Sequence, residues 1–203
     1  GLVVSDRDEQ NRETIFDHLP QDLPRLMTVG RLDLDSEGLL LMTNDGDLAR
    51  HLELPSTGWS RKYRVRAQGQ INESQLAALA DGVTIDGIRY GQVIAKLDRQ
   101  MASNAWLTVA IREGKNREIR RIMEYLGHKV SRLIRISYGP FQLGDLEDGA
   151  IEQVKARVLA DQLGLGEGTL EASEKPTLSI NKPAHSRIPF QYSASWPVSG
   201  TFG

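Results

Sequence analysis

The chain has 203 residues, 39% of them hydrophobic and 26% charged, which is ordinary for a folded protein with a substantial core. It contains no cysteine, which excludes disulfides, a thiolate nucleophile and cysteine-ligated zinc, and its four histidines show no metal-ligand spacing. The sequence has no apolar stretch long enough to cross a bilayer and no signal-peptide pattern. We therefore expect no metal site and no membrane partner.

The net charge of −2 hides a strong separation of charge along the chain. Eight basic and three acidic residues lie between Arg112 and Arg135, and the segment 61–66 adds four cations around one tyrosine. Residues 144–174 reverse the balance, with eight acidic and two basic residues. Local basic clusters interleaved with tyrosine are typical of proteins that bind a polyanion, so we expect a nucleic-acid partner.

The first part of the chain predicts short strands, turns and one short helix. Residues 1–5 have the apolar character of a strand fragment, and residues 6–28 are polar, with prolines that break any long helix. An apolar run at residues 39–42, followed by an Asn-Asp-Gly turn, predicts a short buried strand. Asp47 then favours the start of a helix over residues 48–54.

From residue 63 the pattern becomes regular. Residues 63–67 alternate like a strand with one wet face, and Asn72 or Glu73 would begin a helix that Gly82 ends. Asn116 would cap a second helix with an apolar stripe at positions 119, 122, 123 and 126. Further strands are predicted at residues 83–85, 91–97, 106–111 and 129–137. This order predicts an α+β protein whose mixed, mostly antiparallel sheet is covered by helices and includes a split β-α-β (ferredoxin-like) half.

The regular pattern ends near residue 165. Residues 165–203 are rich in glycine, serine and proline and have no periodicity, so we expect a poorly ordered tail or linker there. The sequence thus predicts one folded domain over residues 1–164, followed by this tail.

The segment 30–38 places charged residues directly before the apolar run. A carboxylate at the mouth of a buried strand, such as Asp33 or Asp35, is desolvated on one side, so its protonation state and nucleophilicity can be tuned. Three interpretations compete: a solvated acidic turn, a calcium loop, and an aspartate nucleophile with Arg31 beside it. The calcium loop is disfavoured because Asn44 stands where its twelfth position needs a bidentate glutamate.

Tyr63 lies among four cations. A tyrosine on a strand is most often half-buried packing. With Arg61, Lys62 and Arg64 around it, Tyr63 is also suited to stack on a base while its neighbours hold phosphates, as when an extruded nucleotide is gripped.

A second cluster of cations occupies residues 112–121. Gly114 lets the backbone approach a ligand, and the start of the predicted helix offers free N–H groups to an anion. Arg117, Arg120 and Arg121 share the face opposite the apolar stripe, which is ordinarily a solvated face with Glu-Arg pairs. Because cations at a helix start oppose the helix dipole, we expect a compensating anion there.

Together these segments resemble the RsuA/RluB-type ribosomal RNA pseudouridine synthases, over nearly everything from residue 1 to residue 160. The resemblance rests on GRLD at residues 30–33 followed by LLLMTNDG, RKY at 61–63, EGKNREIRRI at 113–122 and VSRLIRISYG at 130–139, in the family's order and spacing. The last segment looks more like the large-subunit members. By comparison with the family, we expect the usual S4-like RNA-binding domain and the residues that complete the first motif to be missing, and the first strand to be truncated.

The resemblance implies the pseudouridine-synthase fold and its chemistry. Such enzymes flip a uridine into a cleft, an aspartate attacks the ribose C1′ or the uracil ring, and the base is released, rotated and rejoined through C5. Asp33 would be the nucleophile and Tyr63 the stacking residue and proton acceptor. Arg120 would be the cation that keeps Asp33 ionised, with Arg117 as the alternative. The residues implied to hold the RNA backbone are Arg31, Lys62, Arg64, Lys115, Arg117, Arg121, Arg132 and Arg135.

The resemblance also implies the setting of the reaction. We expect no metal and no organic cofactor, and a monomer that modifies large-subunit ribosomal RNA in the cytoplasm during ribosome biogenesis. A second hypothesis is a non-catalytic RNA-binding module that uses the same basic cleft. Asp33 discriminates between the two, because a carboxylate in a basic cleft repels phosphate and has no use in a pure binder.

Overall fold

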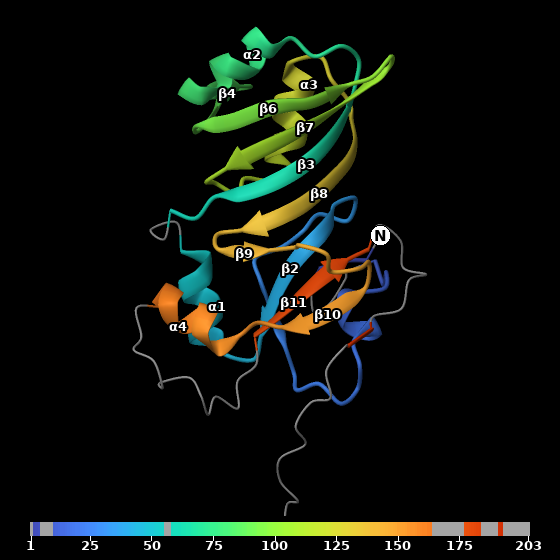
Figure 1. Cartoon of the computed structure of the whole chain (residues 1–203), viewed down its shortest axis with the longest axis vertical. Coiled ribbons are helices and arrows are strands. Elements are labelled where there is room, and N and C mark those ends of the chain that lie inside the picture. The colour runs from blue at the N-terminus through green and yellow to red at the C-terminus, as the bar shows by residue number, and fades with distance from the viewer. Residues whose placement is uncertain (1, 5–9, 55–57, 164–176, 184–190, 193–203) are drawn as a thin grey trace, which may run out of the picture.

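The computed structural model describes residues 2–4, 10–54, 58–163, 177–183 and 191–192. Within these ranges, strands form a ten-stranded mixed sheet in the order β12-β10-β11-β2-β8-β3-β7-β6, with β1 added to β2 and β9 to β8 (Figure 1). The strands of this sheet are β1 (Met27–Val29), β2 (Glu37–Thr43), β3 (Arg61–Gln68), β6 (Val93–Gln100), β7 (Asn104–Ile111), β8 (Val130–Tyr138), β9 (Phe141–Gln142), β10 (Ala150–Gln153), β11 (Thr177–Lys182) and β12 (Gln191–Tyr192).

The helices flank this sheet, and a small hairpin lies outside it. The helices are η1 (Ile15–His18), α1 (Gly46–Glu53), α2 (Glu73–Ala78), η3 (Leu79–Asp81), α3 (Glu118–Tyr125) and α4 (Ala156–Leu163). The hairpin consists of β4 (Val83–Ile85) and β5 (Ile88–Tyr90).

The large sheet has two halves that meet at a short parallel junction. β2 and β8 pair in parallel through Glu37 with Ile134 and Gly38 with Arg135. Gly38 is required here because its φ is +98° and a Cβ would lie 2.4 Å from the Arg135 carbonyl oxygen. The loop that precedes β2 therefore reaches the edge at which the two halves meet.

In the half formed by β3, β6, β7 and β8, one face of the sheet packs under helices. Alternate residues of a strand point to opposite faces, and Tyr63 and Val65 of β3 belong to the buried set. They share one core with Leu76 of α2 and with Ile119 and Ile122 of α3. The apolar stripe predicted from helical periodicity thus covers this face of the sheet.

In the other half, β2 is buried along its whole length. Leu39 and Leu41 pack in a cluster with residues of α1 and α4. Leu40 and Met42 point the other way and join the main core with the N-terminal residues and β11. Burial on both faces explains why this strand reads as a continuous apolar run rather than an alternation.

The predicted α+β class is confirmed, and the order β3-α2-β6-β7-α3-β8 is that of the split half. The start of the first helix is shifted from its predicted position. Asp45, and not Asp47, accepts the free backbone N–H groups of α1, which therefore begins at Gly46. Asn72 caps α2 as expected.

The predicted domain boundary at residue 164 is wrong for one segment. Residues 177–182 form β11, which pairs antiparallel with β2 through six residue pairs and also pairs with β10. Leu178 and Ile180 of β11 are fully buried in the main core. The folded domain therefore includes this strand, whereas most of the predicted tail lies outside the described residues.

The substitution Ile180→Ala tests this assignment. Because Ile180 is fully buried, removing its side chain should lower the free energy of unfolding by about 2–5 kcal/mol. Ile94→Ala is the matched control, since Ile94 is 58% exposed, and it should change the value by about 0.5 kcal/mol or less. Denaturant unfolding measures both, and equal small effects would contradict the placement of β11 in the core.

Candidate active site

The loop between β1 and β2 forms one wall of a cavity of about 590 Å³. The other walls come from β3, β8 and the residues 114–119 that lead into α3. Six of the residues predicted to act in catalysis or RNA binding line this cavity: Arg31, Asp33, Tyr63, Lys115, Arg117 and Arg135. Four segments far apart in the sequence are thus brought to one site.

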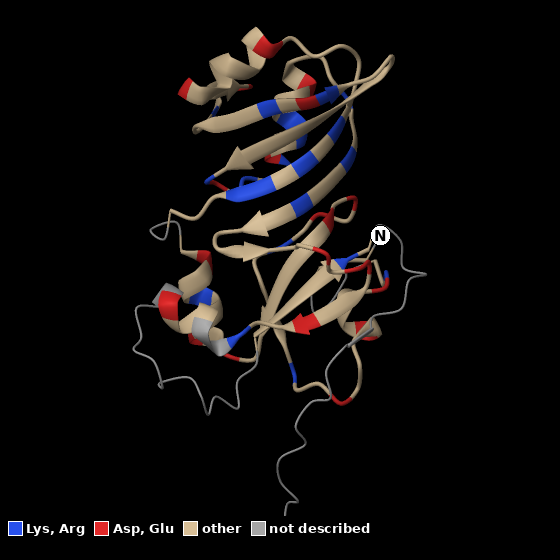
Figure 2. Cartoon of the chain, in the orientation of Figure 1, with Lys and Arg blue, Asp and Glu red and all other residues tan. Residues whose placement is uncertain are grey.

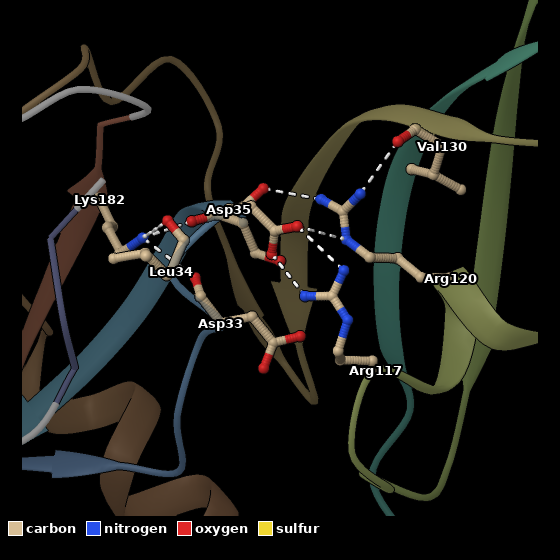
Figure 3. A network of polar contacts seen from close by, with 8 residues as sticks. Asp33, Leu34, Asp35, Arg117, Arg120, Val130 and Lys182 are labelled. Carbon is tan, nitrogen blue, oxygen red and sulfur yellow. Dashed lines mark hydrogen bonds and ion pairs between the residues drawn. The ribbon is translucent and has the colours of Figure 1, made fainter.

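Asp33 is half-buried, and its carboxylate makes no hydrogen bond or ion pair with any residue that the structure describes (Figure 3). Its main chain, in contrast, is fixed. The Asp33 carbonyl oxygen accepts hydrogen bonds from the backbone N–H of Ser36 at 3.0 Å and from Nζ of Lys182 at 3.2 Å. The residue therefore has a held backbone and an unengaged carboxylate in the cavity.

Asp35, two residues further on, is gripped by two arginines (Figure 3). Both terminal nitrogens of Arg117 donate to the carboxylate, at 3.0 and 3.1 Å, in a bidentate pair. Arg120 places Nε 3.3 Å from Oδ2 and donates to the Asp35 carbonyl oxygen at 2.7 Å. These contacts tie the loop before β2 to the start of α3.

The two arginines also set the charge state of this loop. Burial raises the pKa of Asp35, but the hydrogen bonds from Arg117 and the charges of Arg120 and Arg117 outweigh it, so the net pKa lies below the ordinary value. Asp35 is therefore the anion that the cations at the helix start were expected to need.

Arg117 reaches Asp35 from an unusual backbone conformation. Its φ of +51° lies in the left-handed region, which residues other than glycine rarely adopt. Arg117, rather than the expected Asn116, thus occupies the residue before α3. The turn is closed by Glu118, whose carboxylate accepts the backbone N–H of Lys115 at 2.9 Å. Burial raises the pKa of Glu118.

The predicted ion pair between Arg120 and Asp33 is not formed. Arg120 is committed to Asp35 and to the carbonyl oxygen of Val130, which it meets at 3.0 Å. Arg117, the alternative partner, also binds Asp35. The physical reason is loop geometry, because the Asp35 side chain faces the arginines while Asp33 points past them into the cavity (Figure 3).

Lys182, at the end of β11, holds the same loop from the opposite side (Figure 3). Its fully buried side chain donates to three carbonyl oxygens: Asp33 at 3.2 Å, Leu34 at 3.3 Å and Ser36 at 2.5 Å. One ammonium thus supplies hydrogen-bond donors to three backbone carbonyls of the same turn. Burial lowers the pKa of Lys182 to about 8, against the opposing charges of Glu37, Asp35 and Asp33.

Arg135 was predicted to bind RNA, but it is only 2% exposed and mainly supports the main chain. Its Nε donates to the Leu39 carbonyl oxygen at 2.7 Å and one terminal nitrogen to that of Arg31 at 3.1 Å. The guanidinium lies over the ring of Tyr138, 5.3 Å from its centroid. Its other terminal nitrogen has no hydrogen-bond partner among the described residues, and the side chain lines the cavity.

Tyr63 reaches the cavity from the helix-covered face of β3 and is 9% exposed. Arg61, on the same face, donates to the carbonyl oxygens of Arg112 at 2.9 Å and Glu113 at 3.1 Å, and to the Tyr138 hydroxyl at 3.2 Å. Arg61 therefore fixes the segment before α3 against β8 and β3.

Four of the predicted RNA-binding residues lie outside the cavity. Lys62 and Arg64 alternate with Tyr63 along β3, so their exposed side chains point from the opposite face of the sheet. Arg132 is paired with Glu37 at 2.7 and 2.9 Å. Arg121 is exposed on α3. The single basic surface expected from the sequence is thus divided between two faces.

In the part of the chain that the structure describes, no group of three or more histidine, aspartate or glutamate residues could hold a metal ion. Among the helices described, none is long and apolar enough to span a membrane.

The comparison with protein families matches residues 1–125 to the family described as RNA pseudouridylate synthase. A solved structure titled "Crystal structure of pseudouridylate synthase" superposes with a TM-score of 0.68 at 28% identity, over 80% of this chain and 69% of that one. The chain belongs to the RNA pseudouridylate synthase family. It is an isomerase of uridine to pseudouridine in RNA, and nothing in these comparisons supports a non-catalytic RNA-binding module.

Two relatives illustrate the range of similarity. An uncharacterized RNA pseudouridine synthase of Rickettsia felis is 48% identical over 159 residues, which cover 78% of this chain and 69% of the relative. The ribosomal large subunit pseudouridine synthase B of Haemophilus influenzae is 43% identical over 145 residues, or 70% of this chain and 40% of the relative. The chain therefore spans less than half of the Haemophilus protein.

Sequence reasoning missed Lys182 and gave Asp35 no role. Lys182 follows a short alternation, with Leu178 and Ile180 apolar and Ser179 and Asn181 polar, which is a weak strand signal inside a polar segment. The contact between Lys182 and the loop depends on the pairing of β11 with β2, which lies more than 130 residues earlier in the chain. No local sequence pattern reveals such a pairing.

The pH dependence of stability should expose the buried ammonium. The pKa of Lys182 falls from 10.5 to about 8 on folding, so its contribution is full above 10.5 and is lost as the pH falls through 8. The free energy of unfolding of the parent should therefore rise relative to Lys182→Met between pH 7 and 10, by up to about 3 kcal/mol. Urea unfolding of both proteins measures the difference. If the free energy of unfolding of the parent instead fell relative to that of Lys182→Met as the pH rises, the carbonyl contacts would outweigh the effect of burial.

Proposed function

We propose that the chain converts a uridine of ribosomal RNA to pseudouridine, with Asp33 as the nucleophile. The observation that carries the proposal is the unengaged Asp33 carboxylate, held by its main chain in a cavity that Tyr63 and several cations line. Ribosomal RNA is supported by the Haemophilus relative and by a Salmonella typhi relative of the same description, 42% identical over 144 residues, 70% of this chain and half of that protein.

The reaction in this cavity is balanced without an oxidant or a second substrate. Asp33 attacks the flipped nucleotide at the ribose C1′ or at the uracil ring, and the bond between C1′ and N1 breaks. The base turns in the cavity, a bond forms between C1′ and C5, and the carboxylate is released. The proton that leaves C5 is matched by the proton gained at N1, so substrate and product are isomers.

The residues that line the cavity are suited to each step of this reaction. Tyr63 offers a ring to stack on the flipped base and a hydroxyl that can accept the C5 proton. Arg117 and Arg120 interact electrostatically with Asp33 without hydrogen bonding to it, so they bring positive charge to this side of the cavity. Arg31 and Lys115, both exposed at the cavity, are suited to bind the phosphates beside the flipped nucleotide.

The wider setting follows from the same relatives. We assign the substrate to the large ribosomal subunit because two curated relatives carry that description. A monomeric enzyme that acts in the cytoplasm during ribosome biogenesis agrees with this assignment.

Asp33→Asn tests the nucleophile. The amide keeps the size of the side chain but cannot form the covalent intermediate, so the single-turnover rate should fall at least about a thousandfold, a barrier increase of about 4 kcal/mol. RNA affinity should be kept, because a negative charge is removed from a basic cavity. Asp145→Asn, the same change at an exposed residue outside the cavity, is the control.

The readout is pseudouridine formed in deproteinised large-subunit ribosomal RNA at saturating enzyme. A single-turnover rate of Asp33→Asn within about tenfold of the parent rate, which corresponds to a barrier change of at most about 1.4 kcal/mol, would exclude Asp33 as the nucleophile.

A further inference from the structure

The face of the sheet that turns away from the catalytic cavity carries a second concentration of positive charge. The register of the strands defines two rows across this face. One row places Arg132, Arg66, Trp106 and Arg99 side by side on β8, β3, β7 and β6. The next row contains Ile134, Arg64, Thr108 and Lys96 on the same four strands. Lys62, one step further along β3, points the same way.

This face is open in the part of the chain that the structure describes. α2 and α3 pack on the other side, against the core that contains Tyr63 and Val65. Figure 1 shows β6, β7, β3 and β8 in front with α3 behind them, and Figure 2 shows the blue Lys and Arg positions running across these strands. Lys62, Arg64 and Lys96 are exposed.

The positive charge of the face is largely uncompensated. Arg132 has a carboxylate partner, Glu37. Within the described residues, Lys62, Arg64, Arg66, Lys96 and Arg99 form no ion pair, and the one acidic side chain among them, Asp98, accepts a hydrogen bond from Thr108 at 2.8 Å. Five unpaired cations on one face of a protein with a net charge of −2 indicate an anionic partner.

The face also offers aromatic and apolar surface between the cations. The guanidinium of Arg64 lies over the Trp106 ring, 5.0 Å from its centroid, and Trp106 remains partly exposed. Ile94, at the edge strand, is 58% exposed. A helix-backed antiparallel sheet that presents cations and an aromatic ring on its free face is an arrangement that RNA-binding domains use, with phosphates on the cations and bases on the ring.

We propose that this open face binds a second segment of the same RNA substrate, on the opposite side of the sheet from the flipped uridine. The inference rests on the proposed function, since it takes the substrate to be a large structured RNA. β3 then contacts RNA from both faces: Tyr63 holds the target nucleotide in the cavity, and Lys62 and Arg64 bind backbone phosphates that lie elsewhere in the folded RNA.

RNA is favoured over an acidic protein by the spread of the charge. The cations come from three strands, β3, β6 and β8, and are spread over two rows and beyond rather than gathered in one pocket. Contacts of this kind add affinity that depends on salt and carries little sequence information. The face would therefore orient the RNA for the cavity rather than select the uridine.

The test is a triple variant, Arg66→Gln, Lys96→Gln and Arg99→Gln, none of which lines the cavity. The matched control replaces three exposed cations of the other half of the molecule, Arg25→Gln, Arg50→Gln and Lys155→Gln, so that both variants have the same net charge. Binding to deproteinised large-subunit ribosomal RNA is measured by filter binding over a series of salt concentrations.

The open-face variant should bind at least about tenfold more weakly at low salt, and its log-log salt slope should flatten by about 2 to 3, near 0.7–0.9 for each lost phosphate contact. The control should keep the parental slope. Equal salt slopes for the two variants would overturn the proposal, and an acidic protein would then be the partner that fits this face. Pseudouridine formation by the parent is scored separately, so a flattened slope without turnover would refute the proposed function but not this surface.

Discussion

The site depends on the way the turn before β2 is held from both sides. Arg117 and Arg120 grip Asp35 from the start of α3, and the buried ammonium of Lys182 gathers the carbonyl oxygens of Asp33, Leu34 and Ser36 from behind. A turn of this kind carries more unsatisfied backbone acceptors than its own residues can supply with donors. Basic side chains from two distant segments supply the missing donors, and the Asp33 carboxylate is left unengaged.

This arrangement links the fold to the chemistry. The turn lies where the two halves of the sheet join, and Gly38 allows β2 to approach β8 closely enough for that junction to form. The arginines come from one half, and Lys182 comes from the other. Relative movement of the halves would change the position of Asp33. Because Lys182 ends β11 and holds the Asp33 turn, the packing of β11 on β2 bears on catalysis as well as on stability.

The sequence predicts what is local and leaves open what is long-range. Helical and strand periodicity locates β3, α2, β7, α3 and β8 to within a few residues, and the GRLD and EGKNREIRRI motifs bring Asp33 and Arg117 to the same cavity. The choice of Asp35 rather than Asp33 as the arginine partner depends on side-chain direction within one turn, which spacing does not define. Strand alternation in RKYR, in contrast, already implies that Tyr63 and its neighbours Lys62 and Arg64 point to opposite faces.

A double-mutant cycle on Asp35→Asn and Arg117→Gln tests most directly whether this grip positions the nucleophile. The measured quantity is the single-turnover rate at saturating enzyme on deproteinised large-subunit ribosomal RNA. If both changes break the same contact, the double variant should be no slower than the slower single variant, with a coupling energy of about 0.5–3 kcal/mol. Strictly additive losses, or single variants as fast as the parent, would contradict the account.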